Sequence, residues 1–234
     1  MIEGAAEALK QLLRLGKKIL MLTNNGSYTP ESVMQRLAAE GVDLVEGQVL
    51  TSSMVAMDWL VAKGLQGKAA MVLANSSVET QFKGVVTTVP IRRGSGASVV
   101  VVGRDLEFDF GRLAAAAASV RTGALLIALN RDDVMPTENG LEPGTGAILA
   151  AIEAASGSKA VIIGKPYLPM MQAAVERVGE TGVLMVGDRA ESDVAGARAV
   201  GWDAALVLSG ADPAPAEGRL RPDYVAANLL ELIQ

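Results

Sequence analysis

The sequence predicts an α/β protein whose core is a doubly wound parallel sheet, with a second α/β domain inserted into that core. Two features of the chain predict this class. Short, nearly continuous apolar runs such as Lys18–Thr23 alternate with segments whose apolar residues recur at helical spacing. The alternation also breaks into a second α/β run near residue 67 and resumes its first pattern after Ile163, which indicates an insertion.

The first part of the chain reads helix, strand, helix. In chain order, we expect a helix over 4–15, a strand over 18–23, a polar turn over 24–27, a helix from 30 and a helix over 54–63. Thr29, Pro30 and Glu31 mark the start of the third element, because they are an N-cap residue, a first-turn proline and a first-turn acid.

The middle and last parts continue the alternation. Predicted strands cover 70–74, 85–89, 98–102, 124–128, 183–186 and 204–208, and predicted helices cover 112–121, 146–155, 169–179, 190–200 and 226–233. The stretch 130–144 is predicted to be a long, turn-rich loop, and long loops inside compact domains are often functional. The resulting domain boundaries are 1–66 for the first part of the core, 67–162 for the inserted domain and 163–234 for the rest of the core.

Composition excludes several classes of function. The 234 residues contain no Cys and no His, which removes thiol nucleophiles, imidazole bases and the usual zinc sites. The net charge is −5 with no basic run, so we expect no nucleic-acid partner. We also expect no membrane partner, because no apolar run approaches the roughly 20 residues needed to span a bilayer. A cytoplasmic protein is the resulting expectation.

Two segments carry groups that suit an anion. Thr23 and Asn24 follow the first predicted strand and offer a hydroxyl, an amide and backbone N–H groups. Lys165 stands just before a predicted helix and is a point charge suited to phosphate. Taken alone, such a lysine is usually exposed, so the interpretation depends on the order of the segments.

A third segment carries carboxylates that suit a cation. Asp188 and Asp193 follow the apolar strand at 183–186, and carboxylates at the carboxyl end of a parallel strand can bind a hard cation such as Mg²⁺. Isolated acids at a helix start are capping or surface residues about as often as they are metal ligands. We interpret Glu191 as a solvated acid of the first helical turn.

These segments, in this order, resemble the second, third and fourth motifs of the haloacid dehalogenase superfamily. The resemblance extends over nearly the whole chain and is closest to the subclass with a large α/β cap between the second and third motifs, which contains p-nitrophenyl, phosphoglycolate, pyridoxal and nucleotide phosphatases. The residues that carry it are 2–9, 22–25, 136–140, 143–146, 164–166 and 186–189.

The resemblance implies a Rossmann-like core, a Mg²⁺ cofactor and a small phosphorylated metabolite as partner. It implies that the phosphoryl group is bound by Thr23, Asn24, Asn25 and Lys165. Asp188 would bind Mg²⁺, and Asp193 would hold the arrangement in place. A homodimer formed through the cap follows from the resemblance alone.

The resemblance also implies that the cap loop beginning near Arg131 faces the leaving group. The substrate residues expected there are Asn130, Arg131, Asp132 and Met135. Pyridoxal phosphatases have a histidine at the position of Met135, so pyridoxal phosphate is not favoured. The residues alone are also consistent with Asn130 to Asp132 being ordinary turn residues.

The first motif of the family, Asp-x-Asp-Gly on the central strand, has no counterpart in residues 1–22. Its first Asp is the nucleophile and a metal ligand, and its second is the general acid and base. The strands at 18–23 and 183–186 would flank that missing core strand, leaving a gap of about 9–10 Å, twice the normal spacing. Two explanations stay open: Met1 is an internal residue of a longer gene, or the strand is lost and the core has repacked.

Two functional hypotheses of different classes follow. The first is a Mg²⁺-dependent phosphatase of small phosphomonoesters that acts through an aspartyl-phosphate and that is inactive as the 234 residues stand. The second is a non-catalytic phosphometabolite-binding or scaffolding protein on a degenerate fold. A generic nucleotide-binding protein would need a phosphate-loop glycine pattern that this sequence lacks.

Overall fold

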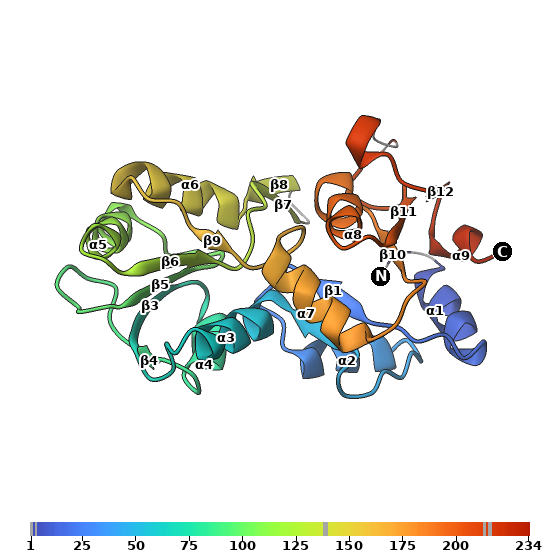
Figure 1. The fold of residues 1–234 in the computed structure, drawn as a ribbon, viewed down its shortest axis with the longest axis horizontal. Helices are drawn as coiled ribbons and strands as arrows, with labels where there is room; N and C mark the ends of the chain where they lie inside the picture. Colours follow the sequence, from blue (N-terminus) through green and yellow to red (C-terminus); the bar gives the residue numbers. More distant parts are fainter. Residues whose placement is uncertain (1, 3, 138–139, 213, 215–216) are drawn as a thin grey trace. The chain divides into compact units, whose positions relative to one another are not determined.

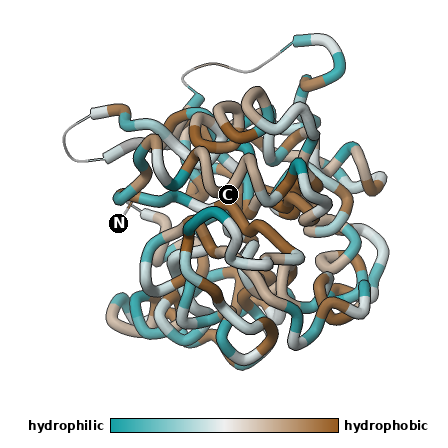
Figure 2. The backbone as a smooth tube through the Cα atoms, turned by 90° about the vertical axis from the view of Figure 1, so that its left-hand side faces the viewer, coloured by the Kyte–Doolittle hydropathy of each residue, from teal (hydrophilic) through white to brown (hydrophobic). Residues whose placement is uncertain are grey.

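The computed structural model describes the chain except for residues 1, 3, 138–139, 213 and 215–216. It divides into two compact units. Unit 1 comprises 1–22, 29–50 and 165–234, and unit 2 comprises 23–28 and 51–164. Hydrophobic and hydrophilic segments alternate along the backbone, as the sequence pattern predicts (Figure 2). No helix in the described ranges is both long and apolar enough to cross a membrane.

Unit 2 is built on a parallel sheet of five strands in the order β4-β3-β5-β6-β9. Its strands are β3 (Ala69–Leu73), β4 (Thr87–Thr88), β5 (Val99–Val102), β6 (Leu125–Ala128) and β9 (Val161–Ile162). Its helices are α3 (Ser52–Ala62), α4 (Ser76–Phe82), α5 (Phe110–Arg121) and α6 (Thr145–Ser156). Helices α5 and α6 lie on one face of the sheet, and α3 and α4 lie on the other (Figure 1). The predicted class, an α/β protein with a parallel sheet, is confirmed.

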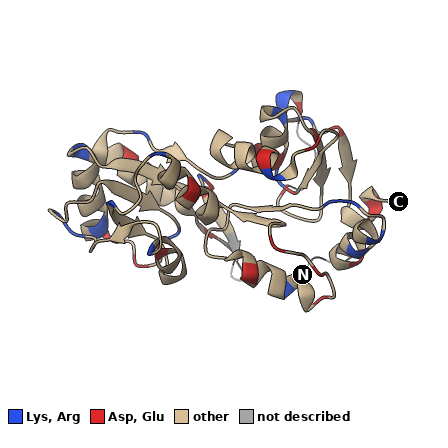
Figure 3. Cartoon of the chain, turned by 60° about the horizontal axis from the view of Figure 1, so that its bottom comes forward, with Lys and Arg blue, Asp and Glu red and all other residues tan. Residues whose placement is uncertain are grey.

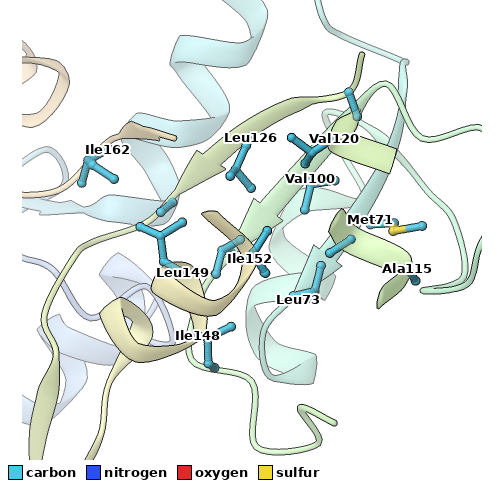
Figure 4. Packing of buried hydrophobic residues seen from close by; sticks show 14 residues of the cluster. Met71, Leu73, Val100, Ala115, Val120, Leu126, Ile148, Leu149, Ile152 and Ile162 are labelled. Atoms are coloured by element: carbon cyan, nitrogen blue, oxygen red, sulfur yellow. The ribbon is translucent and has the colours of Figure 1, made fainter. Parts of the chain in front are cut away.

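The core of unit 2 lies between the sheet and the helices α5 and α6 (Figure 4). Alternate residues of each strand point to this face, as the period of two requires, while their neighbours point to the opposite face. The buried residues that form it include Met71, Leu73, Val100, Val102, Leu126, Leu149 and Ile152. Covered on both faces, β5 is four consecutive buried valines, which explains why its apolar run is continuous.

Unit 1 contains the parallel three-stranded sheet β10-β11-β12. These strands are β10 (Leu184–Gly187), β11 (Asp203–Val207) and β12 (Tyr224–Ala226). The helices of unit 1 are α1 (Ala5–Arg14), α2 (Pro30–Ala38), α7 (Leu168–Val178), α8 (Ala195–Ala199) and α9 (Leu229–Leu232). A single π-helical turn at 190–194 precedes α8, and a 3₁₀ turn spans 218–220. Thr29 caps α2 by accepting from Ser32 N, as its sequence position predicts.

A separate two-stranded sheet pairs β1 (Met21–Thr23) with β2 (Val49–Thr51). In the part of the chain that the structure describes, β1 pairs only with β2, and β10 pairs only with β11. Apolar side chains on β10 are more exposed to solvent than is usual for a core strand, since Leu184 is 42% and Val186 is 37% exposed. The expectation that a further strand belongs between β1 and β10 agrees with these open edges but stays a prediction.

Several elements of the structure differ from the prediction. The stretch 130–144 is not only a loop, because β7 (Val134–Thr137) and β8 (Gly140–Pro143) form an antiparallel hairpin within it. Strands β2, β9 and β12 and helix α4 were not predicted. The strand predicted over 85–89 contracts to the two residues of β4, and the helix predicted over 226–233 contracts to α9. The predicted domain boundaries at 66 and 162 stay a prediction, although α3 lies with unit 2 in this structure.

Candidate functional site

The turn that follows β1 is held by its own side chains. Thr23 Oγ1 accepts a hydrogen bond from Asn25 N at 3.1 Å, and Asn25 Oδ1 accepts one from Ser27 N at 3.0 Å. A hydroxyl that accepts in this way can still donate its own proton. The predicted phosphate residues Thr23, Asn24 and Asn25 therefore form one ordered turn, with backbone and side-chain donors close together.

Residues from distant parts of unit 2 position the same turn. The carbonyl of Asn24 accepts from Ser52 Oγ at 2.9 Å and from Asn130 Nδ2 at 2.8 Å. Ser53 Oγ donates to the carbonyl of Gly26 at 2.8 Å. The side chain of Asn24 donates to Asp132 Oδ2 at 3.5 Å. The structure thus joins Asn24 to Asn130 and Asp132, while the role of Ser52 and Ser53 gave no signal in the sequence.

Gly164 allows the close approach of Asn24. A Cβ on Gly164 would lie 2.4 Å from Asn24 Oδ1 and 2.6 Å from the carbonyl oxygen of Leu129, and the backbone atom cannot rotate away. We expect Gly164→Ala to lower the free energy of unfolding by about 1–3 kcal/mol, measured by urea denaturation, and to displace Asn24. Gly84→Ala is the matched control because its Cβ would meet nothing within 4 Å. Equal effects at both positions would contradict this account.

The side chain of Arg131 is bound to Glu153. Its Nη1 and Nη2 lie 3.2 and 2.9 Å from the two carboxylate oxygens, and Lys159 Nζ and Ala160 N also donate to that carboxylate. The Arg131 hydrogen bonds are the main cause that lowers the pKa of Glu153 to about 2. Burial opposes this shift, while Ala160 and Lys159 support it. Arg131 therefore positions the loop that contains Asn130 and Asp132.

This ion pair predicts a pH dependence of stability. Because the pKa of Glu153 is lowered from 4.5 to about 2, its contribution is present above pH 4.5 and is lost as pH falls toward 2. We expect a loss on the order of 2 kcal/mol, less than the full shift because Lys159 is largely exposed. Urea denaturation of wild type and Glu153→Gln across this range is the measurement. Parallel curves for the two proteins would rule out the assignment.

Met135 lies on β7, where it is paired with Glu142 of β8. The structure therefore places it on a hairpin strand and half-buried. Its neighbours Asn130 and Asp132 precede the hairpin, and both contact the Asn24 turn. The substrate role of Met135 stays a prediction.

Unit 1 contains the second group of predicted site residues. Lys165 Nζ lies 2.7 Å from Asp193 Oδ1 and 3.3 Å from the carbonyl oxygen of Leu22. The Lys165 side chain is 14% exposed and that of Asp193 is 4% exposed. Asp193 Oδ2 accepts from Arg189 N at 3.1 Å. A buried charge pair with satisfied oxygens holds the ammonium group in one position next to the end of β1.

Asp188 is positioned by the loop at 210–212. Its Oδ2 accepts from Ala211 N at 2.8 Å, and its carbonyl accepts from Asp212 N at 3.0 Å. Asp212 in turn accepts from Ala190 N at 2.6 Å. A Cβ on Gly210 would lie 2.1 Å from Asp188 Oδ2, so only glycine fits there. Glu191 is exposed, in agreement with its interpretation as a solvated acid.

The donor set fits Mg²⁺ in part. Asp188 supplies a carboxylate, and Mg²⁺ is usually bound by one or two carboxylates together with several waters. Within the described ranges, no group of three or more Asp, Glu, His or Cys side chains gathers as a complete metal site. Acidic and basic residues are interspersed over the chain in Figure 3. The role of Asp188 as the Mg²⁺ ligand stays a prediction.

Comparison with known proteins decides the family. A family model for haloacid dehalogenase-like hydrolases matches residues 1–86, and one described as HAD-hydrolase-like matches residues 162–232. The acid sugar phosphatase of Staphylococcus aureus is 32% identical over 211 residues, which are 89% of this chain and 80% of that protein. The chain belongs to the haloacid dehalogenase-like hydrolases. The family resemblance seen in the sequence is confirmed.

Two further members of the haloacid dehalogenase-like family are similar over nearly the whole chain. The D-glycerol 3-phosphate phosphatase of Mycobacterium tuberculosis is 33% identical over 99% of this chain, which spans 66% of that relative's length. The crystal structure of a glycerol phosphate phosphatase from Mycobacterium tuberculosis in complex with magnesium has a TM-score of 0.86 at 31% identity, covering 98% of this chain and 70% of that one. A double mutant of the thermostable NPPase of Geobacillus stearothermophilus has a TM-score of 0.87 at 32% identity, covering 98% and 92%.

Proposed function

We propose that this chain carries the binding groups of a Mg²⁺-dependent phosphatase of small phosphomonoesters. The observation that carries the proposal is the buried Lys165–Asp193 pair at 2.7 Å, which presents a fixed ammonium group beside the end of β1. The relatives named as phosphatases of glycerol phosphate and of acid sugars support this class of reaction. Their substrates are small phosphorylated molecules, and we propose the same kind of partner here.

In this proposal each residue acts on the charge of the phosphoryl group. Lys165 neutralises it, and Asp193 keeps the lysine extended and oriented. Donors of Thr23, Asn24 and the 23–28 turn bind its oxygens, which is the electrostatic stabilisation that phosphoryl transfer requires. Asp188 would hold Mg²⁺, which supplies further positive charge at the phosphate.

The nucleophile is not among these 234 residues. By resemblance, an Asp of an Asp-x-Asp segment attacks phosphorus, the ester P–O bond breaks and releases the alcohol, and water then hydrolyses the aspartyl-phosphate to free Asp and inorganic phosphate. No Asp-x-Asp occurs in the sequence. We therefore expect the chain to bind phosphate and to show no Mg²⁺-dependent hydrolysis of p-nitrophenyl phosphate above background.

The test is a pair of measurements on the 234-residue chain. Phosphate binding is followed by calorimetry with Mg²⁺ present, and we expect Lys165→Met to weaken it by at least about tenfold. Hydrolysis of p-nitrophenyl phosphate is followed in the same buffer. Turnover that Asp188→Asn leaves unchanged would overturn both the metal role and the expected inactivity.

A second candidate is a non-catalytic protein that binds phosphorylated metabolites, and the absence of Asp-x-Asp favours it for the chain as it stands. The two candidates differ in one outcome. A phosphatase site gains turnover when an Asp-x-Asp segment is supplied, whereas a binding protein does not. Homodimerisation through the cap at 67–162 and a cytoplasmic location stay predictions.

A further inference from the structure

Ser27 lies in the candidate phosphate turn, and three of its polar groups already have partners. Ser27 N donates to Asn25 Oδ1 at 3.0 Å, and the Ser27 carbonyl accepts from Ser77 Oγ at 2.9 Å. Ser27 Oγ accepts from Asn75 Nδ2 at 2.7 Å. Among the residues that the structure describes, the hydroxyl proton of Ser27 has no acceptor. Ser27 is half-buried, so a bound molecule can reach this proton.

The direction of the hydrogen bond between Asn75 and Ser27 is fixed by helix α4. Asn75 is the N-cap of α4, and its Oδ1 accepts from Val78 N at 3.1 Å. The amide oxygen must face Val78 N, because the amide nitrogen carries two protons and cannot accept a hydrogen bond. The NH₂ group therefore faces Ser27. Ser27 Oγ can only be the acceptor of this bond, and its own proton points elsewhere.

Thr23 and Asn25 share this arrangement with Ser27. Thr23 Oγ1 accepts from Asn25 N at 3.1 Å, and Asn25 Oδ1 accepts from Ser27 N at 3.0 Å. The side-chain oxygens of the alternate residues 23, 25 and 27 are thus each bound to a donor of the protein. The protons that these side chains still carry are the O–H of Thr23, the NH₂ of Asn25 and the O–H of Ser27. Consecutive members of the row contact one another, so these donors lie close together.

The backbone of the turn is packed against the rest of unit 2. Gly26 is buried, and a Cβ on it would lie 2.6 Å from Ser53 Oγ and 2.7 Å from Leu129 Cδ1. The carbonyl of Gly26 accepts from Gln81 Nε2 at 3.1 Å as well as from Ser53 Oγ. Carbonyl oxygens would repel an anion, and here donors of unit 2 bind them. The half-buried hydroxyl of Ser27 is left as a donor to a ligand.

We infer that Ser27 is a further binding residue for the phosphoryl group, and that Asn75 is the positioning residue that orients its hydroxyl as a donor. The oxygens of a fully ionised phosphate accept hydrogen bonds and carry no proton to donate, so the anion needs donors around it. Ser27 adds one donor to those of Thr23 and Asn25. This inference rests on the proposed function, because it assumes that the 23–28 turn binds the phosphoryl group.

Ser27 is tested by the affinity for inorganic phosphate, measured by calorimetry on the 234-residue chain with Mg²⁺. Ser27→Ala should weaken binding by about tenfold, because it removes a hydrogen bond to a charged group. Ser27→Thr keeps the hydroxyl and should bind within about twofold of wild type. Ser76→Ala is the matched control. It removes an exposed hydroxyl from the residue next to Asn75, and it should leave the affinity unchanged.

Asn75 is tested by reversing the polarity of its bond to Ser27. Asn75→Asp keeps the N-cap of α4, but its second oxygen accepts, so the hydroxyl of Ser27 turns to donate to it. The readout is the ratio of two affinities at a pH of about 6, where phosphate still carries protons and sulfate does not. We expect Asn75→Asp to lower the sulfate to phosphate ratio by about tenfold. Partial unfolding would lower both affinities equally and leave the ratio unchanged.

The same substitution in the Ser27→Ala background measures the effect of the added charge alone, and there the ratio should change by at most about threefold. An equal change in both backgrounds would overturn the role of Asn75. If Lys165→Met weakens phosphate binding and Ser27→Ala does not, the role of Ser27 is overturned while the proposed function stands. If the wild-type chain binds no phosphate, both are overturned.

Discussion

Adding a segment that ends in Asp-x-Asp-Gly ahead of Ile2 should raise hydrolysis of p-nitrophenyl phosphate from background by at least about a thousandfold, because it supplies a nucleophile beside Lys165. The open edges of β1 and β10 give an extended apolar segment two rows of backbone partners. Lys165 already contacts Leu22 of β1 and Asp193 of the π-helical turn that follows β10.

The matched control for this experiment is the same extension with its first Asp replaced by Asn. It should raise the unfolding midpoint in urea as the unsubstituted extension does, without hydrolysing p-nitrophenyl phosphate. An extended protein that is more stable and binds phosphate, yet stays at background activity with the intact Asp-x-Asp segment, would refute the phosphatase proposal and favour the binding protein.

Replacing Asp193 by Ala should lower the free energy of unfolding by about 3 kcal/mol, because it leaves the Lys165 ammonium in a mostly buried position without its carboxylate. The change also removes the acceptor of Arg189 N. Urea denaturation is the measurement, and phosphate binding should fall in parallel, since the lysine is no longer held.

Glu191→Gln is the control for this second experiment. It removes one negative charge two residues away, on the same helical turn, from an exposed side chain, and it should change stability by less than about 0.5 kcal/mol. Similar losses for the two variants would show that net charge, and not the buried pair, accounts for the effect.

Local sequence patterns predicted most of the elements and the identity of the chemical groups. The buried valines of β5 and the Thr29-Pro30 helix start follow from rules that act within a few residues, and the structure bears them out. The hairpin β7–β8 and the strand β2 escaped prediction, because their short strands depend on pairing with a partner strand and not on a periodic pattern of their own.

The candidate site also divides into residues that the sequence identified and contacts that only the fold brings about. Lys165, Asp188 and Asp193 were identified from their order along the chain, and the structure adds that Lys165 and Asp193 form a buried pair. The contact of Gly164 with Asn24 could not be predicted. It joins residues that are tens of positions apart in the sequence.

The sequence by itself determined the α/β class, the family and the chemistry of the site: a lysine, carboxylates and hydroxyl or amide donors, without cysteine or histidine. The tertiary structure decided which of these groups touch. It turned Arg131 toward Glu153 and fixed Asp188 against the 210–212 loop. The physical reason is that strand register sets distances between residues far apart in the chain, and no local pattern specifies that register.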